Sequence, residues 1–179
     1  MSDPAGGLTF RAMAAADFPT MTAWLAMPHV KAFYQPKPIS LDEVCAHYGP
    51  RLAEDWPTRC HIAESHGRPF AYLQCYRNAD WPDWEAETGV AGGLSIDLYI
   101  GEPAFVGRGY GQAMLRGYVR DVVFPRWPDE PVCYIAHAVA NTRALACSQA
   151  VGFRDIGRFE EDGVPMRLLV LGRDQSSSR

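Results

Sequence analysis

The chain has 179 residues, of which 47% are hydrophobic and 21% are charged, and its formal net charge at pH 7 is -4. This composition is typical of one globular domain with a sizeable core, and it excludes an intrinsically disordered chain. The acidic balance argues against nucleic-acid binding, and no apolar run approaches the roughly 18 residues of a membrane span. The first seven residues lack the features of a signal peptide, so we expect a cytoplasmic protein.

The cysteines and histidines give no indication of a disulfide framework or a metal site. The five cysteines are scattered, and none has CxxC spacing. The five histidines show no ligand spacing either. We therefore expect reduced, mostly buried thiols and no metal.

The first half of the chain alternates short strand-like runs with helical segments. Residues 8–13 alternate apolar and polar side chains and predict a strand. Asp17 is a candidate cap for a helix that Pro28 ends, and Ser40 with Glu43 has capping-box spacing for a second helix. Two β-rich runs around a Gly-containing turn then predict a hairpin, over residues 60–64 and 70–76.

The second half is more regular after an aperiodic segment. Residues 78–93 are rich in Trp, Asp, Glu and Gly, and we interpret them as a long functional loop. A helix is predicted from Gly109 to about Phe124, and a second one between a cap at Asn141 and an end at Gly152. Strands are predicted over residues 94–100 and 132–136, from Phe153 onward, and over 166–171. The order is α/β with a mixed sheet, and residues 174–179 are expected to be a disordered tail.

The segment Val106-Gly107-Arg108-Gly109-Tyr110-Gly111 places three alternating glycines between a predicted strand and an amphipathic helix. Without a Cβ, glycine lets backbone N–H groups approach a phosphate, and the helix N-terminus adds partial positive charge. The spacing predicts an anion-binding loop, with a plain strand-to-helix turn as the alternative. A P-loop is excluded because Gly-Lys-Ser/Thr is absent, and Gln112 stands where a dinucleotide fingerprint needs glycine.

Four features occur in an order that resembles the GNAT N-acetyltransferase superfamily over about residues 59–170. They are the strand Ile96 to Ile100, the glycine loop, the run Asn141 to Ala144 and the pair Gly152-Phe153. Val106 departs from the Gln or Arg that is usual at the head of the loop. Further matches resemble the aminoglycoside 6'-N-acetyltransferases and related siderophore acyltransferases; they are Trp24 and residues 29–34, 41–44, 48, 81–88 and 95–97.

This resemblance implies a fold, a cofactor and a cofactor site. The fold is a single GNAT domain over residues 1–173, with a mixed, largely antiparallel sheet of about seven strands flanked by about four helices. Acetyl-CoA is the implied co-substrate, its pantetheine arm on the strand backbone and its pyrophosphate on the loop amides. The implied cofactor-binding residues are Leu98, Tyr99, Ile100, Val106, Gly107, Arg108, Gly109, Tyr110, Gly111 and Asn141.

Acyl transfer to an amine needs a base, oxyanion stabilisation and a proton for the thiolate. Asp97 matches the carboxylate that the aminoglycoside enzymes use as base, with a salt-bridged or capping Asp as the alternative. The Leu98 N–H is the implied oxyanion donor. His137 and Ser148 stand where those enzymes place a substrate-binding Asp and a proton-donating Tyr. We therefore consider His137 as a second acid/base group titrating near neutrality, or as an ordinary strand-end histidine, and Ser148 as a proton relay through water.

The acidic and aromatic residues of the 78–93 segment suit a cationic ligand through charge attraction and cation–π contact, with a solvated loop as the alternative. Candidate substrate-binding residues are Asp80, Trp81, Asp83, Trp84, Glu87 and His137. Cys147 lacks an orienting partner, so we expect direct transfer in a ternary complex rather than an acyl-enzyme.

The sequence thus predicts an acetyl-CoA-dependent N-acetyltransferase that acts on a primary amine of a small, aminoglycoside-like cation. The alternatives are a siderophore-type (hydroxy)lysine N-acyltransferase and a catalytically silent CoA-binding module. A dinucleotide oxidoreductase is disfavoured by the glycine spacing. We expect a small-molecule amine as the partner, with neither nucleic acid nor membrane, and either a monomer or a homodimer.

Overall fold

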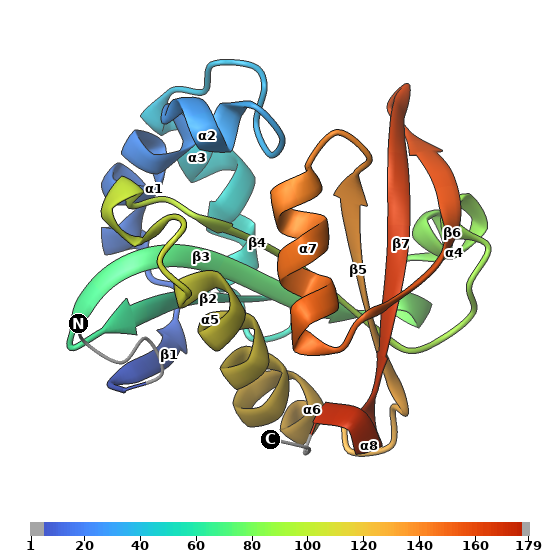
Figure 1. Ribbon diagram of the computed structural model, residues 1–179. Coiled ribbons are helices and arrows are strands. Elements are labelled where there is room, and N and C mark those ends of the chain that lie inside the picture. The colour runs from blue at the N-terminus through green and yellow to red at the C-terminus, as the bar shows by residue number, and fades with distance from the viewer. Residues whose placement is uncertain (1–5, 177–179) are drawn as a thin grey trace. The chain divides into compact units, whose positions relative to one another are not determined.

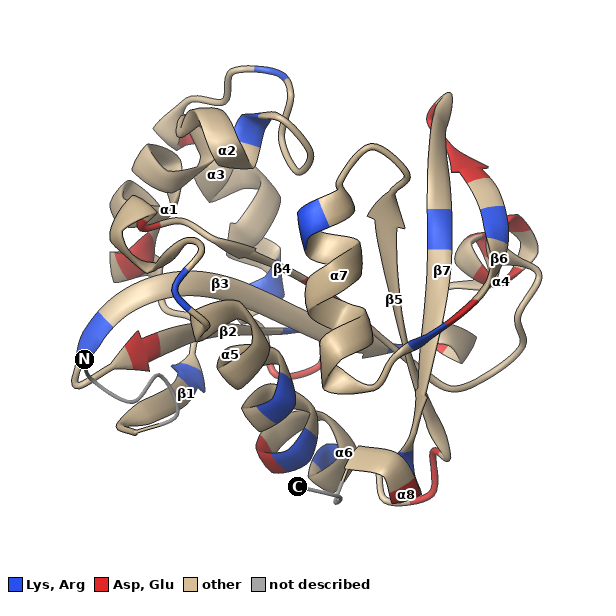
Figure 2. Ribbon diagram, in the orientation of Figure 1, with Lys and Arg blue, Asp and Glu red and all other residues tan. Residues whose placement is uncertain are grey.

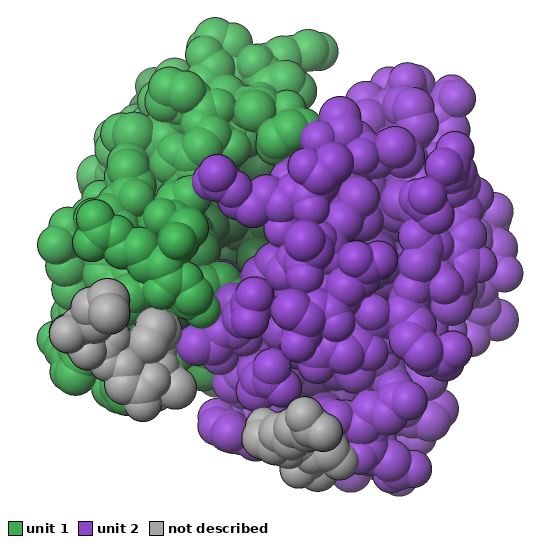
Figure 3. Space-filling view, viewed as in Figure 1, with its two compact units in different colours: residues 1–74, 98–111 green, residues 75–97, 112–179 purple. Residues whose placement is uncertain are grey.

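The computed structural model describes residues 6–176, and the chain divides into two compact units (Figure 3). Unit 1 comprises residues 1–74 and 98–111, and unit 2 comprises residues 75–97 and 112–179. No helix among residues 6–176 is long and apolar enough to cross a membrane. The single domain over residues 1–173 stays a prediction of the sequence.

The strands form one seven-stranded mixed sheet in the order β1-β2-β3-β4-β5-β7-β6, as the sequence resemblance predicts (Figure 1). The strands are β1 (Leu8–Ala12), β2 (Arg59–Ser65), β3 (Arg68–Arg77), β4 (Leu94–Ile100), β5 (Val132–Ala138), β6 (Arg154–Glu161) and β7 (Val164–Gly172). The helices are α1 (Phe18–Leu25), α2 (Pro28–Lys31), α3 (Leu41–Tyr48), α4 (Pro82–Thr88), α5 (Tyr110–Tyr118), α6 (Phe124–Arg126), α7 (Thr142–Val151) and α8 (Arg173–Ser176).

In unit 1, β1 pairs antiparallel with β2, and Arg11 fixes the turn that follows β1. Its guanidinium donates to both carboxylate oxygens of Asp17, at 2.7 and 2.8 Å, and to Glu64 Oε1 at 2.7 Å. This bidentate arrangement is the strongest geometry for an Arg–carboxylate pair. Asp17 therefore holds the short 3-10 turn Ala15–Asp17 against the sheet, directly before α1.

The helices of unit 1 begin where the sequence places polar caps and prolines. The predicted capping box is confirmed, because Glu43 N donates to Ser40 Oγ at 3.2 Å and Ser40 N donates to Glu43 Oε2 at 2.7 Å. The prediction for Pro28 was incomplete: α1 ends at Leu25, and Pro28 begins the separate short helix α2. Proline suits a first helical position because its missing N–H has no partner there.

The backbone of Gly101 lies directly against the Trp24 ring, in the core of unit 1. A Cβ built on Gly101 would lie 2.0 Å from Trp24 Cγ. Trp24 itself is 3% exposed, so the indole has no open space to move into. Gly101 N also donates to the Phe70 carbonyl at 2.9 Å, which fixes the end of β4 beside β3. Glycine at position 101 is therefore required by packing.

In unit 2, β5 lies between β4 and β7. The parallel ladder joins Leu94–Ile96 to Cys133–Ile135, whereas β7 pairs antiparallel with both β5 and β6. Strand β6 carries a bulge between Asp155 and Gly157. Helix α7 has the predicted ends: the Asn141 side chain accepts from Ala144 N at 3.2 Å, and Gly152 terminates the helix in the left-handed conformation, with φ at 115°.

Two sequence-based assignments in unit 2 are corrected by the structure. Residues 78–93 are not an irregular loop: they contain a 3-10 turn over Asn78–Asp80 and the helix α4, which starts with Pro82 and stops at left-handed Gly89. The sequence did not predict α4 because a helix of seven residues is too short to show a repeat of apolar positions.

The predicted helix from Gly109 to Phe124 is three pieces: α5, a π-helical turn over Val119–Val123, and α6. Pro125 has no N–H to offer the carbonyl four residues earlier; it lies in the first turn of α6, directly after the π-helical turn. The last carbonyls are satisfied from elsewhere, since the Arg173 guanidinium donates to Phe124 O at 3.1 Å and Trp127 O at 2.6 Å.

We predict that Gly101→Ala lowers the free energy of unfolding by about 1–3 kcal/mol, because the new methyl group overpacks the Trp24 ring. The measurement is the denaturant midpoint in equilibrium unfolding. Gly49→Ala is the matched control: it lies at φ −54°, and a Cβ there meets nothing within 4 Å. Equal stability of the two variants would show that the close approach at Gly101 is not a constraint.

Candidate active site

Asp97 is the first residue of β4 after the parallel ladder with β5, and its side chain is half-buried. The Tyr76 hydroxyl forms a hydrogen bond with the Asp97 carboxylate. Burial raises the pKa of Tyr76 well above its usual value, and the negative charges of Asp97 and Glu161 raise it further. Tyr76 is therefore a neutral phenol that positions the candidate base.

The buried Ser95 hydroxyl lies at the centre of a hydrogen-bond network behind Asp97. Ser95 Oγ donates to Asn78 Oδ1 at 2.6 Å and accepts from Trp84 Nε1 at 3.1 Å. Asn78 Nδ2 in turn donates to the Gly92 carbonyl at 2.9 Å. Because both Ser95 and Asn78 are fully buried, each needs these partners. The network fixes the Trp84 indole on α4 relative to the strand that carries Asp97.

Glu161, at the end of β6, is a second half-buried carboxylate of this site, and the sequence reasoning missed it. Burial, together with the negative charges of Asp97, Glu87 and Asp162, raises the pKa of Glu161 to about 7. Every charge that perturbs Glu161 is therefore negative. Phe159, two residues earlier on the same face of β6, contacts Trp84 edge-to-face with ring centroids 5.5 Å apart. The period-2 alternation of β6 could have placed Glu161 beside Phe159, facing α4.

The structure brings some of the predicted substrate-binding residues together and leaves others apart. The Trp84 indole donates a hydrogen bond to Ser95, two residues before Asp97. The negative charge of Glu87 raises the pKa of Glu161. The centroid of the Trp81 ring lies 6.1 Å from that of the Tyr76 ring. Asp80 and Asp83 are exposed. Figure 2 colours the acidic residues of α4 red, and no basic residue lies on that helix.

His137 and Ser148 form a direct pair within unit 2. His137 Nε2 lies 2.7 Å from Ser148 Oγ, and Ser148 is 1% exposed. Burial lowers the pKa of His137 to about 4, so the imidazole is neutral at pH 7. The expectation that His137 titrates near neutrality is thus corrected, because desolvation disfavours the imidazolium. Burial also raises the pKa of the Cys147 thiol, which leaves it a poor nucleophile.

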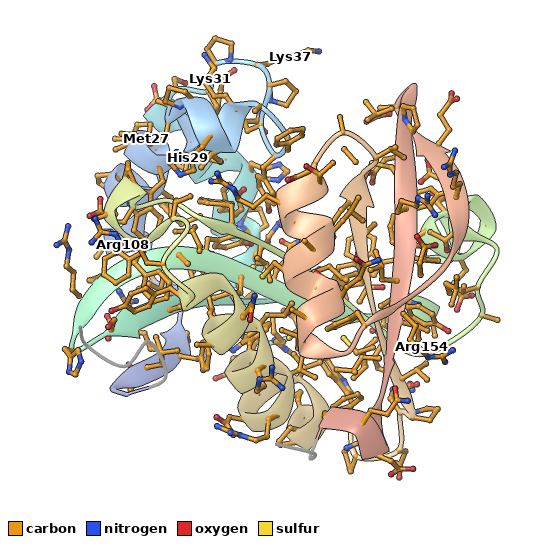
Figure 4. All side chains as sticks on the ribbon, in the orientation of Figure 1. Met27, His29, Lys31, Lys37, Arg108 and Arg154 are labelled. Atoms are coloured by element: carbon orange, nitrogen blue, oxygen red, sulfur yellow. The ribbon has the colours of Figure 1, made fainter. Side chains whose placement is uncertain are left out.

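Residues 98–100 of β4 carry the backbone that is predicted to bind the pantetheine arm, and one of their carbonyl groups already has a hydrogen-bond partner in the protein. The Ile100 carbonyl lies 2.8 Å from His29 Nε2, on α2, where Figure 4 labels His29. The Leu98 side chain is half-buried, and Tyr99 packs into the core of unit 1. The predicted contacts of the Leu98 and Tyr99 backbone with the co-substrate stay predictions. The Ile100 carbonyl already contacts the His29 ring.

The glycine loop leads from a short 3-10 turn, Pro103–Phe105, into α5. Aromatic packing holds it: the Phe105 ring stacks on Phe70 at 4.6 Å and contacts Tyr110 at 4.7 Å. Gly107 and Gly109 have φ of 75° and 85°, which favours glycine. Nothing lies within 4 Å of a Cβ built on Gly107, and Arg108 is exposed (Figure 4). Alternation of left-handed residues turns successive N–H groups to one side, as in anion-binding nests.

Within residues 6–176, no group of three or more His, Cys, Asp or Glu side chains is arranged to hold a metal ion. Asn141 uses its side-chain oxygen as the cap of α7.

Solved structures share this fold. The structure of AAC(6')-Ib in complex with paromomycin and acetyl-CoA matches with a TM-score of 0.82 and 22% identity, covering 94% of this chain and 95% of that chain. The aminoglycoside N(6')-acetyltransferase of Legionella pneumophila matches with a TM-score of 0.74 and 22% identity, covering 97% and 96%. Spermidine N-acetyltransferase of Vibrio cholerae, in complex with CoA and spermine, matches with a TM-score of 0.72 and 15% identity, covering 96% and 99%.

Comparison with curated proteins gives no match to the sequence. The model of the acetyltransferase (GNAT) domain family matches residues 13–161, which is most of the chain. This match confirms the predicted family, the expectation of an acyltransferase and acetyl-CoA as its co-substrate. The chain belongs to the GNAT acetyltransferase family.

Proposed function

We propose that this GNAT enzyme transfers the acetyl group of acetyl-CoA to a primary amine of a small cationic molecule. The observation that carries the proposal is the grouping of Asp97, Glu161 and Glu87, in which every charge acting on half-buried Glu161 is negative. Carboxylates held together in a partly desolvated place favour a cationic ligand. The Trp84 ring nearby offers an aromatic face.

The ligands of two structural neighbours support the same acceptor class. Paromomycin is the ligand named for AAC(6')-Ib, and spermine is the ligand named for the Vibrio cholerae enzyme. The proposal for this chain remains at the level of the class, a small molecule with at least one primary amine. We also propose that the enzyme acts in the cytosol.

In the proposed mechanism, Asp97 accepts a proton from the acceptor ammonium, directly or through water. The neutral nitrogen then forms a bond to the thioester carbonyl carbon, and the Leu98 N–H stabilises the oxyanion. Collapse of this intermediate re-forms the C=O bond and breaks the C–S bond. The nitrogen loses its second proton to water as the intermediate collapses. The products are an amide and the CoA thiolate, which takes up a proton.

The His137–Ser148 pair is our proposed source of that proton. A neutral imidazole that donates from Nε2 to Ser148 Oγ leaves the serine O–H free to point elsewhere. Ser148 then gives its proton to the thiolate and regains one from water. The glycine loop suits the pyrophosphate of the co-substrate, because Gly107 and Gly109 are both left-handed and nothing lies within 4 Å of a Cβ built on Gly107.

We predict that Asp97→Asn lowers kcat/KM by about 100-fold to 10,000-fold, the usual contribution of a general base. The assay is release of the CoA thiol with kanamycin, spermidine and simple primary amines as acceptors. Asp129→Asn, an exposed acid of unit 2, is the matched control and should match the unsubstituted enzyme. Acetyl-CoA binding without thiol release on any amine would replace the proposal by a catalytically silent binding module.

We predict that Glu161→Gln stabilises the fold at pH 8 and weakens acceptor binding. The raised pKa means that the folded state binds more protons than the unfolded state between about pH 4.5 and 7, so Glu161 costs stability as the pH rises through this window. The variant removes that cost. Its gain in Tm should therefore be larger at pH 8 than at pH 5.

The control is Glu160→Gln, because Glu160 is exposed on the opposite face of β6. It should change neither the pH dependence of Tm nor the KM of the acceptor. If Glu161→Gln shows the same Tm difference at both pH values, the pKa of Glu161 is not raised in the folded state.

A further inference from the structure

The direction of the Ile100 carbonyl, at the end of β4 in unit 1, follows from one hydrogen bond. Gly101 N donates to the Phe70 carbonyl of β3 at 2.9 Å, so the N–H of the Ile100–Gly101 peptide unit faces β3. This peptide is trans, and in a trans peptide the C=O and the N–H point in opposite directions. The Ile100 carbonyl therefore points away from β3.

The alternation of a β-strand extends this argument to Leu98. Residues two apart in a strand direct their N–H and C=O groups to the same side, so the Leu98 groups also point away from β3. The parallel ladder of β4 with β5 covers Leu94–Ile96 and ends before Leu98. Residues 98–100 thus direct two carbonyls, those of Leu98 and Ile100, to an edge of β4 that lies beyond this ladder.

His29 already binds one of these two carbonyls. Its Nε2 lies 2.8 Å from Ile100 O. A carbonyl oxygen can only accept, so Nε2 carries a proton and donates it to this bond. Because the Ile100 carbonyl points away from β3, the half-buried imidazole lies where an extended ligand would pair with the edge of the strand.

The helix that carries His29 is short and has one residue in the core. Of the four residues of α2, Val30 is buried, at 2% exposure, and Pro28 is exposed. The Met27 carbonyl accepts from Val30 N and Lys31 N, at 3.0 and 2.9 Å, and thereby holds the first turn. A single hydrogen bond adds little net stability, so the imidazole can leave the Ile100 carbonyl while Val30 keeps α2 in place.

We propose that His29 is a latch on the co-substrate site, which holds the Ile100 carbonyl until an amide N–H of the pantetheine arm replaces the imidazole. The inference rests on the proposed function in one respect, that acetyl-CoA lies along this edge of β4. A pantetheine arm carries two amide N–H groups, and residues 98–100 direct two carbonyls to the edge. Pairing of both amides exchanges the His29 hydrogen bond for one to the ligand, and this exchange lowers the affinity for acetyl-CoA.

The first experiment is calorimetric titration of the full chain with acetyl-CoA. His29→Ala removes the competing donor and should tighten binding about threefold to tenfold, the value of one hydrogen bond. His29→Gln is the matched control, because its side-chain amide keeps a donor, and it should bind like the unsubstituted protein. Adenosine 3',5'-bisphosphate carries the nucleotide without the pantetheine arm and should bind all three proteins equally.

Three results of this titration would overturn the proposal. Weaker binding of acetyl-CoA to His29→Ala would show that His29 supports the site or contacts the ligand. Equal binding would show that the Ile100 carbonyl accepts from the imidazole and the ligand together. An equal gain for adenosine 3',5'-bisphosphate would show a general opening of the site rather than release of one carbonyl.

The second experiment observes the latch in the unsubstituted protein, so it does not depend on the folding of a variant. The Nε2 resonance of His29 is followed by NMR in protein labelled with ¹⁵N-histidine and is assigned by its absence from His29→Gln. Saturating acetyl-CoA should shift this resonance, because the imidazole loses its acceptor, whereas adenosine 3',5'-bisphosphate should leave it in place. An unchanged resonance with acetyl-CoA bound would contradict the latch.

Thiol release with amines separates this proposal from the proposed acetyl transfer. If the three proteins bind acetyl-CoA in the expected order while no amine is acetylated, the latch stands and the proposed acceptor class fails. If amines are acetylated but His29→Ala binds acetyl-CoA no more tightly, the reverse holds. If none of the three proteins binds acetyl-CoA, both proposals fail.

Discussion

The candidate base depends on polar groups that are buried on one face of the sheet. Ser95 and Asn78 have no access to water, so their hydrogen bonds must be completed inside the protein. They are completed by each other, by the Trp84 indole and by the Gly92 carbonyl, which leaves few arrangements for the segment between β3 and β4. The position of α4 and the surroundings of Asp97 follow from this requirement. A change at Ser95 would disturb the helix, the tryptophan and the acid together.

Much of the fold could be predicted from local patterns. The capping box at Ser40 and Glu43, the Asn141 cap and the Gly152 terminus are short-range signals, and the structure has all three. The helix α4 could not be predicted because its seven residues are mostly acidic or aromatic and show no period. Its stability comes from tertiary contacts, including the Glu85 side chain, which accepts from Gly92 N at 2.6 Å.

In the candidate site, too, some features could be predicted from the sequence and others could not. Asp97 was selected because a family pattern surrounds it, and its role as base stays a prediction. The pairing of His137 with Ser148 was not predicted and is seen only in the structure. Glu161 was missed because its significance lies in partners far away in the sequence, Asp97 and Glu87. The low pKa of His137 could not be predicted either, since residue type alone suggests titration near neutrality and burial decides otherwise. Electrostatic surroundings arise only once the chain is folded.

The bulged strand β6 has a consequence for how the protein behaves at high concentration. As the last strand in the sheet order, it presents an unpaired edge that could template pairing with another chain. The bulge between Asp155 and Gly157 interrupts the regular spacing of its backbone groups, and Arg158 lies opposite Arg167 across the hairpin. A second copy of the strand would meet an irregular ladder at this point. The bulge therefore disfavours edge-to-edge pairing of two copies along the β6–β7 hairpin, which also carries Glu161.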